Sequence, residues 1–121
     1  MPQIEDEVRL RHILDAARKA VHLTTARTRD DLDSDDTLAL AVVRLLEIIG
    51  EAARSLSEEV RQQAPDVPWR QIAGTRDRLI HRYFEVDLDV VWTIVRDDLP
   101  PLIARVEAML SGGDNVTDRL P

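Results

Sequence analysis

The stretch LALAVVRLLEII, residues 38–49, decides the fold of this 121-residue chain. Ten of its twelve residues are apolar, the exceptions being Arg44 and Glu47. On a helix the apolar positions then cover almost the whole circumference, so this helix must be buried on several sides. A bundle can bury one central helix in this way, and a second copy of the chain could cover any side left exposed. We therefore predict an all-α, up-and-down bundle of four to five helices that forms a homodimer.

Upstream of this stretch, apolar residues spaced by three, four and one positions predict a first helix over about residues 4–28. Between the two helices lie five aspartates in seven residues, which we interpret as a solvated loop ending in an N-cap. Asp31, Asp33 and Asp35 match the first three ligand positions of an EF-hand loop, but the glycine and the bidentate glutamate that such a loop needs are missing. We expect no metal there.

Downstream, proline and glycine divide the chain. Ser57 is the predicted cap of a short third helix that ends at Pro65. Pro68 suits the start of the next helix, because its missing N–H costs nothing there. We therefore predict a helix over residues 69–83, with a weak point at Gly74. No pattern typical of a β-hairpin is present.

The last predicted helix begins after Asp87, a suitable N-cap. Pro100 and Pro101 must kink or interrupt it, because proline lacks the N–H that a helix interior needs. The apolar pattern stops after residue 110. The chain is thus expected to form one helical domain over residues 1–110, followed by a flexible tail over 111–121.

The composition excludes several classes of protein. A formal net charge of −7 argues against a protein that coats nucleic acid, so any nucleic-acid site must be local. No apolar run is long enough to span a membrane, and the acidic start differs from a secretory signal. The absence of cysteine excludes disulfides, thiolate metal sites and cysteine nucleophiles. These features predict a cytoplasmic protein.

Residues 69–83, here called the basic segment, differ from the rest of this acidic chain. They hold one acid, Asp77, together with His81, Tyr83 and four arginines, which are Arg70, Arg76, Arg78 and Arg82. Arginine can bind phosphate, and imidazole can transfer protons near neutral pH. These groups suffice in principle for cleavage of RNA without a metal, because the 2′-hydroxyl of RNA is a built-in nucleophile.

Helical geometry suggests how these groups would cooperate. If the basic segment is one helix, Asp77 and His81 share a face, so the carboxylate would orient the imidazole. Arg76 and His81 are five positions apart and would point in directions about 140° apart. Two copies of the helix facing each other across a two-fold axis would close that gap. The spacing therefore favours a composite site in a dimer.

The run GTRDRLIHRYFEVD, residues 74–87, resembles the signature of the HepT-like branch of the HEPN superfamily. In that signature, arginine, a polar residue and three further residues precede histidine, any residue and tyrosine. The runs AVVRLLEIIGEAA (41–53) and PWRQIAG (68–74) are also similar to that family. The resemblance covers about residues 5–110, and this breadth makes it specific.

The resemblance implies an all-helical homodimer whose paired motifs form an endoribonuclease site in the interface cleft. It also implies a toxin of a toxin–antitoxin pair, silenced by a MntA-like minimal nucleotidyltransferase that transfers AMP from ATP to the motif tyrosine. Carried over to this chain, Arg76 and His81 are catalytic and Tyr83 is the AMP acceptor. Asp77 takes a position that is often asparagine in the family, and an acid would repel phosphate there. This favours the orienting role for Asp77.

In the mechanism that we expect, the 2′-hydroxyl attacks the adjacent phosphorus with His81 as general base or acid, and Arg76 stabilises the phosphoryl oxygens. No metal or cofactor is required, and the product carries a 2′,3′-cyclic phosphate. Three further arginines would bind backbone phosphates with a steep dependence on salt, namely Arg70, Arg78 and Arg82. An anionic AMP group on Tyr83 would block the cleft and repel RNA.

The same residues permit an alternative function. The chain could be a non-catalytic helical subunit that serves as binding partner or scaffold for a nucleotidyltransferase, with the basic segment holding a nucleotide. RNA cleavage by the isolated, unmodified protein distinguishes the two hypotheses. A purely structural module would leave the clustering of arginine, histidine and tyrosine unexplained.

Overall fold

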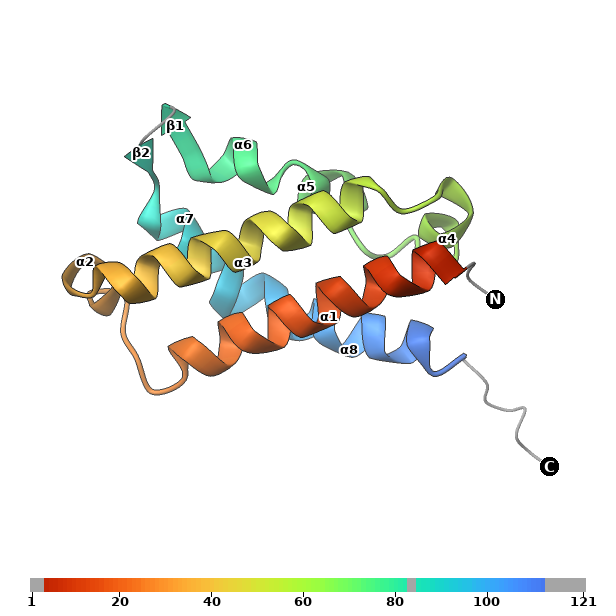
Figure 1. Ribbon diagram of the computed structural model, residues 1–121, viewed down its shortest axis with the longest axis horizontal. Helices are drawn as coiled ribbons and strands as arrows, with labels where there is room; N and C mark the ends of the chain where they lie inside the picture. The colour runs from red at the N-terminus through yellow and green to blue at the C-terminus, as the bar shows by residue number, and fades with distance from the viewer. Residues whose placement is uncertain (1–3, 83–84, 113–121) are drawn as a thin grey trace.

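The computed structural model describes residues 4–82 and 85–112, and over these ranges it confirms the predicted all-α fold. The two long helices α1 (Ile4–Thr24) and α3 (Asp36–Arg54) lie side by side and run in opposite directions (Figure 1). The last helix, α8 (Leu99–Leu110), packs along α1. No helix of the described ranges is both long and apolar enough to cross a membrane.

The central position predicted for residues 38–49 is confirmed. Helix α3 contacts α1 on one side and the segments that follow it in sequence on the other. Its N-cap is Asp35, whose Oδ1 accepts a hydrogen bond from the Leu38 amide at 3.0 Å. Its buried side chains include Leu38, Val42, Leu46 and Ile49. One stripe remains open to solvent, however, because Leu40 is 71% exposed.

The connection between α1 and α3 differs from the prediction. Helix α1 ends at Thr24 and not near residue 28, because Ala26 adopts a left-handed conformation with φ of 63°, which interrupts the helix. The aspartate-rich stretch is not entirely a loop. Residues Asp31–Ser34 form the single turn α2, which Leu32 anchors in the core.

Short polar contacts hold the third predicted helix, α4 (Glu58–Gln62). As predicted, Ser57 caps it, and the Ser57 hydroxyl accepts from the Val60 amide at 3.2 Å. Asp6 is only 3% exposed and accepts from both the amide and the hydroxyl of Ser57, at 2.9 and 2.7 Å. This carboxylate therefore ties the start of α1 to the start of α4.

The basic segment is not one helix, so this prediction is wrong. It divides at Gly74 into α5 (Trp69–Ala73) and α6 (Thr75–Leu79), and then continues as strand β1 (Ile80–Arg82). Strand β1 pairs antiparallel with β2 (Glu85–Val86), with Ile80 opposite Val86. The Asp87 amide donates to the Leu79 carbonyl at 2.7 Å, which turns the chain back where a helix would have continued. The expectation that no hairpin is present is also wrong.

The predicted interruption before the prolines takes the form of a wider helical turn. Helix α7 (Leu88–Thr93) passes into the π-helical segment η1 (Ile94–Asp98) and then into α8. Within this segment the Leu99 amide reaches back five residues to the Ile94 carbonyl. Because Pro100 has no N–H and its ring clashes with a helical carbonyl, the π turn accommodates it without ending the helix. The predicted tail lies mostly outside the described residues.

We predict that Gly50 on α3 sets how closely α5 and α6 approach. A Cβ atom at Gly50 would lie 3.2 Å from the Ile72 carbonyl oxygen and 3.4 Å from the Thr75 Cβ. Gly50→Val should therefore lower the free energy of unfolding by about 1–3 kcal/mol in chemical denaturation, as overpacking does. Gly74→Ala is the control, because its Cβ meets only ordinary contacts at 3.5 Å or more. Equal effects of the two substitutions would contradict the prediction.

Candidate functional site around His81

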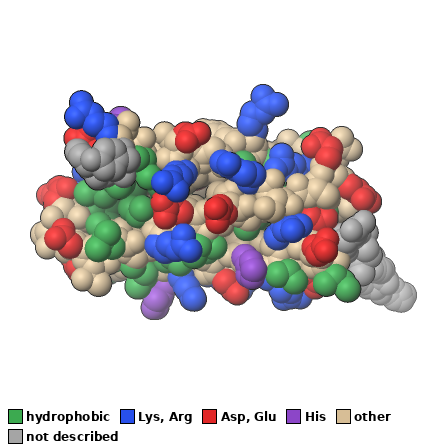
Figure 2. Space-filling view, turned by 45° about the horizontal axis from the view of Figure 1, so that its top comes forward, with side chains coloured by type: hydrophobic (Ala, Val, Ile, Leu, Met, Phe, Trp, Pro, Cys, Tyr) green, Lys and Arg blue, Asp and Glu red, His purple; other side chains and the backbone are tan. Residues whose placement is uncertain are grey.

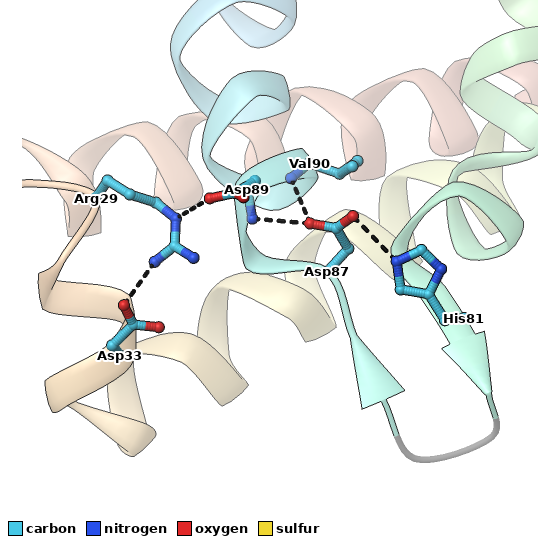
Figure 3. Close-up of polar contacts among 6 residues, drawn as sticks. All are labelled: Arg29, Asp33, His81, Asp87, Asp89 and Val90. Carbon is cyan, nitrogen blue, oxygen red and sulfur yellow. Dashed lines mark hydrogen bonds and ion pairs between the residues drawn. The ribbon is translucent and has the colours of Figure 1, made fainter.

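His81 is held by one carboxylate across the hairpin. It lies on β1, and its Nε2 is 3.1 Å from Oδ2 of Asp87, the residue between β2 and α7 (Figure 3). The His81 side chain is 62% exposed and that of Asp87 is 27% exposed. The imidazole is thus fixed on one side and remains open to solvent elsewhere.

The same carboxylate begins helix α7. Asp87 Oδ1 accepts from the amides of Asp89 and Val90 at 3.0 and 3.2 Å, which confirms the predicted N-cap. The hydrogen bond from the Val90 amide is the main cause that holds the pKa of Asp87 below its usual value, and His81 and the Asp89 amide add to it. Asp87 therefore stays ionised at neutral pH, with each oxygen committed to a different partner.

A second ion-pair chain fixes the start of α7 from outside. Arg29 Nε donates to Asp89 Oδ1 at 2.7 Å, while Arg29 Nη1 lies 3.2 Å from Asp33 Oδ2 (Figure 3). The hydrogen bond to Asp89 is the largest of the interactions that raise the pKa of Arg29. The aspartate-rich connection therefore stabilises the first turn of α7, the helix that Asp87 caps.

Arg76 lies in a different setting from His81. It is exposed on α6 and borders a hollow of about 170 Å³ against α3. The hollow is also bordered by Arg44 and Arg54, so three guanidinium groups surround it together with Glu47 and Glu51. Arg54 additionally donates to the Ala73 carbonyl at 3.1 Å, at the junction of α5 and α6.

The three arginines predicted to bind phosphate do not gather at one point. Arg70 is exposed on α5, and Arg82 on β1 pairs with Glu85 at 3.8 Å. Arg78 is partly buried and lies 3.7 Å from Asp98 of η1, beside a cavity of about 460 Å³ between α5, η1 and α8. Arg70 and Arg82 are thus accessible as they stand, because the Arg82 side chain is 73% exposed despite its carboxylate partner, whereas the Arg78 side chain is only 31% exposed.

The geometric basis of the orienting role predicted for Asp77 is not present. Helix α6 ends at Leu79, so Asp77 and His81 do not share a helical face. The carboxylate that contacts His81 is that of Asp87, which the sequence identified only as a cap. Residues six positions apart do not share a face of a helix. Asp87 and His81 contact each other only because the chain forms a hairpin between them. Tyr83, the predicted AMP acceptor, lies outside the described residues.

Charges of both signs are interleaved on the face that carries the hairpin and α3. Figure 2 shows basic side chains alternating with aspartate and glutamate across its middle, and hydrophobic side chains gathered at its left end. Within residues 4–82 and 85–112, no three histidine, aspartate or glutamate side chains form a group that could hold a metal ion.

Comparison with known proteins places this arrangement in a family. The model of the HepT-like family, described as "Ribonuclease HepT-like", matches residues 13–109. The chain is 38% identical over 100 residues to "Probable ribonuclease HepT" of Thermococcus cleftensis, a match that covers 79% of this chain and 91% of that protein. It is 39% identical over 101 residues to a protein named "Putative RNase" from Caldanaerobacter subterraneus subsp. tengcongensis, covering 84% and 90% of the two chains.

A further relative named "Putative RNase", from Methanocaldococcus jannaschii, is 37% identical over 95 residues, which are 78% of this chain and 87% of that protein. No solved structure matches the chain. The family match includes α3, the basic segment and the Asp87 cap, which are the elements that build the site. The chain therefore belongs to the HepT-like ribonuclease family of the HEPN superfamily.

Proposed function

We propose that this ribonuclease cleaves RNA without a metal or cofactor, with His81 as its proton-transfer group and Arg76 as its phosphate-stabilising group. The observation that carries the proposal is an exposed imidazole fixed by an ionised carboxylate within the most arginine-rich segment of an acidic chain. A fixed imidazole can act as general acid or base. A guanidinium group can stabilise the charge that develops on phosphoryl oxygens.

The reaction is a transfer of the phosphodiester from the 5′-oxygen to the 2′-oxygen of the preceding ribose. The 2′-hydroxyl loses its proton to a base and attacks phosphorus, and the leaving 5′-oxygen receives a proton from an acid. The products are a 2′,3′-cyclic phosphate end and a free 5′-hydroxyl. One imidazole can serve in turn as base or acid, and two copies of the chain would supply one of each.

Arg76 and His81 belong to different surface features of one chain, which supports a composite site in a homodimer. Arg76 borders the hollow against α3, whereas His81 lies on the hairpin. The outer stripe of α3 is suited to self-association, because Leu40 is 71% exposed and Arg44 and Glu51 follow it on the same side. In two antiparallel copies of α3 related by an axis between Glu47 and Ile48, Arg44 faces Glu51 of the other copy.

The exposed arginines would add affinity without reading the sequence of the RNA. Arg70 and Arg82 are open to solvent and can bind backbone phosphates, and Arg78 can join them if its pairing with Asp98 opens. Such contacts weaken steeply as salt rises. The formal charge of −7 would repel RNA elsewhere on the surface and confine it to this region.

In the cell, we propose, this ribonuclease is a cytoplasmic toxin controlled by a MntA-like nucleotidyltransferase antitoxin. The acceptor of AMP would be Tyr83, two residues beyond His81 in the family signature. The phosphate of AMP is anionic and its adenosine is bulky, so the modification would both repel and obstruct RNA beside the imidazole. Silencing then requires no change of fold.

Replacement of either catalytic residue should abolish cleavage. Arg76→Ala and His81→Ala are each expected to slow cleavage of a labelled RNA by at least about 10²-fold, because each removes a group that acts in the transition state. The matched controls are Arg11→Ala and His22→Ala, exposed residues of α1 that should leave the rate unchanged. Chelators should have no effect on the wild-type rate. Nucleotide binding without any cleavage by the isolated protein would favour the scaffold hypothesis instead.

Modification should depend on a single hydroxyl. After co-expression with the transferase, intact-mass measurement should show wild-type protein carrying AMP, and Tyr83→Phe should carry none. Because phenylalanine preserves the ring, Tyr83→Phe should still cleave RNA and should resist the antitoxin. AMP found on Tyr83→Phe protein would show that another residue is the acceptor.

Charge exchange across α3 tests the dimer. Arg44→Glu would place two glutamates opposite each other and should weaken dimerisation by about tenfold or more, measured by analytical ultracentrifugation. Combining it with Glu51→Arg restores opposite charges and should restore both the dimer and cleavage. A wild-type protein that remains monomeric and fully active would refute the composite site.

A further inference from the structure

We infer that Asp87 is a positioning residue that fixes the tautomer of His81, so that Nε2 carries the proton and Nδ1 is the nitrogen that exchanges protons with the RNA. This inference rests on the proposed ribonuclease function. It assigns a task to a residue that the sequence identified only as a helix cap, and it decides which of the two ring nitrogens faces the reaction.

The orientation of the ring follows from the hydrogen bond itself. Nε2 lies 3.1 Å from Asp87 Oδ2. A half-turn of the ring about the Cβ–Cγ bond would replace Nε2 with Cε1 at that position and would remove the bond. Only one of the two orientations therefore satisfies the carboxylate.

The direction of the hydrogen bond follows from the state of Asp87. Its Oδ1 accepts from two backbone amides, which favours the ionised form, and its pKa is lowered in agreement with this. An ionised carboxylate has no proton to donate. Nε2 must then be the donor, and in the neutral ring the free lone pair is at Nδ1. With 62% of the side chain exposed, the ring is accessible to a substrate.

Asp87 can hold this orientation because its own position is fixed. Two amides of α7 bind one of its oxygens, and the next acidic residue of that turn, Asp89, is held by Arg29. The first turn of helix α7 thus fixes the position of the His81 ring, although His81 itself lies on a strand of only three residues. A carboxylate that orients an imidazole and selects its tautomer is an established device in catalysis.

The substitution Asp87→Asn separates this role from the cap. Asparagine is an equally good N-cap, so its side-chain oxygen can keep accepting from the Asp89 and Val90 amides. Its second group is then an NH₂, a donor that faces Nε2. To accept from that donor, His81 must move its proton to Nδ1, which removes the lone pair from the nitrogen assigned to catalysis.

We expect nitrogen NMR of the His81 ring to show a proton on Nε2 in the wild-type protein at a pH where the ring is neutral, and a shift of the proton towards Nδ1 in Asp87→Asn. The inversion is the decisive observation, because a free imidazole also prefers the proton on Nε2. The kcat for RNA cleavage should fall by about 10²- to 10⁴-fold, as expected for a wrong tautomer. The KM should change little, because phosphate-binding arginines are untouched.

The control is Asp35→Asn, the same exchange at the N-cap of α3. Asp35 accepts from the Leu38 amide and contacts no histidine among the described residues. Asp35→Asn should leave both kcat and the His81 tautomer unchanged, because it makes the same exchange at a cap that contacts no histidine among the described residues.

The outcomes distinguish this inference from the proposed function. Wild-type cleavage by Asp87→Asn, or an unchanged tautomer in that variant, would overturn the positioning role. Full cleavage by His81→Ala would overturn the proposed function whatever the tautomer. If the tautomer inverts as expected but the wild-type protein does not cleave RNA, the role of Asp87 in placing the proton on Nε2 stands, whereas the ribonuclease proposal falls together with the role of Nδ1 towards RNA.

Discussion

Burial of helix α3 is the constraint on which the rest of the structure depends. Because residues 38–49 are apolar around most of the helix, α3 must be packed on one side by α1 and on the other by α5 and α6. Gly50 lets the second of these contacts become close, because a Cβ atom at this position would lie 3.2 Å from the Ile72 carbonyl oxygen. The helical part of the basic segment, α5 and α6, is thereby packed against the central helix.

The outer stripe of α3 is the exception to this burial. Leu40 is 71% exposed, so its side chain contributes almost no hydrophobic stabilisation to the single chain. Charged residues of opposite sign, Arg44 and Glu51, follow it along the same side. Under the composite site that we propose, the incomplete burial of α3 and the placement of Arg76 and His81 on different surface features would have one common cause.

In the candidate site, single polar groups serve more than one structural role. One carboxylate, Asp87, both starts a helix and holds an imidazole, and each of its oxygens has a separate task. The connection rich in aspartate, which has the composition of a solvated loop, contributes through Arg29 to the same helix start. Few buried polar groups are needed, because the interactions lie at the edge of the apolar core. The cost is that these roles are coupled, and a change at Asp87 reaches the helix as well as the ring.

The sequence by itself determined the helical class, the central helix, an N-cap at the end of the aspartate-rich stretch, the caps at Ser57 and Asp87, the break at Gly74 and the concentration of arginine and histidine in one segment. These features depend on local periodicity and capping, which neighbouring residues specify. The tertiary structure alone decided that the chain turns back after Leu79, since this depends on a hydrogen bond to an amide eight residues away that a helical pattern cannot reveal. That turn separates Asp77 from His81 and brings Asp87 to the imidazole in its place.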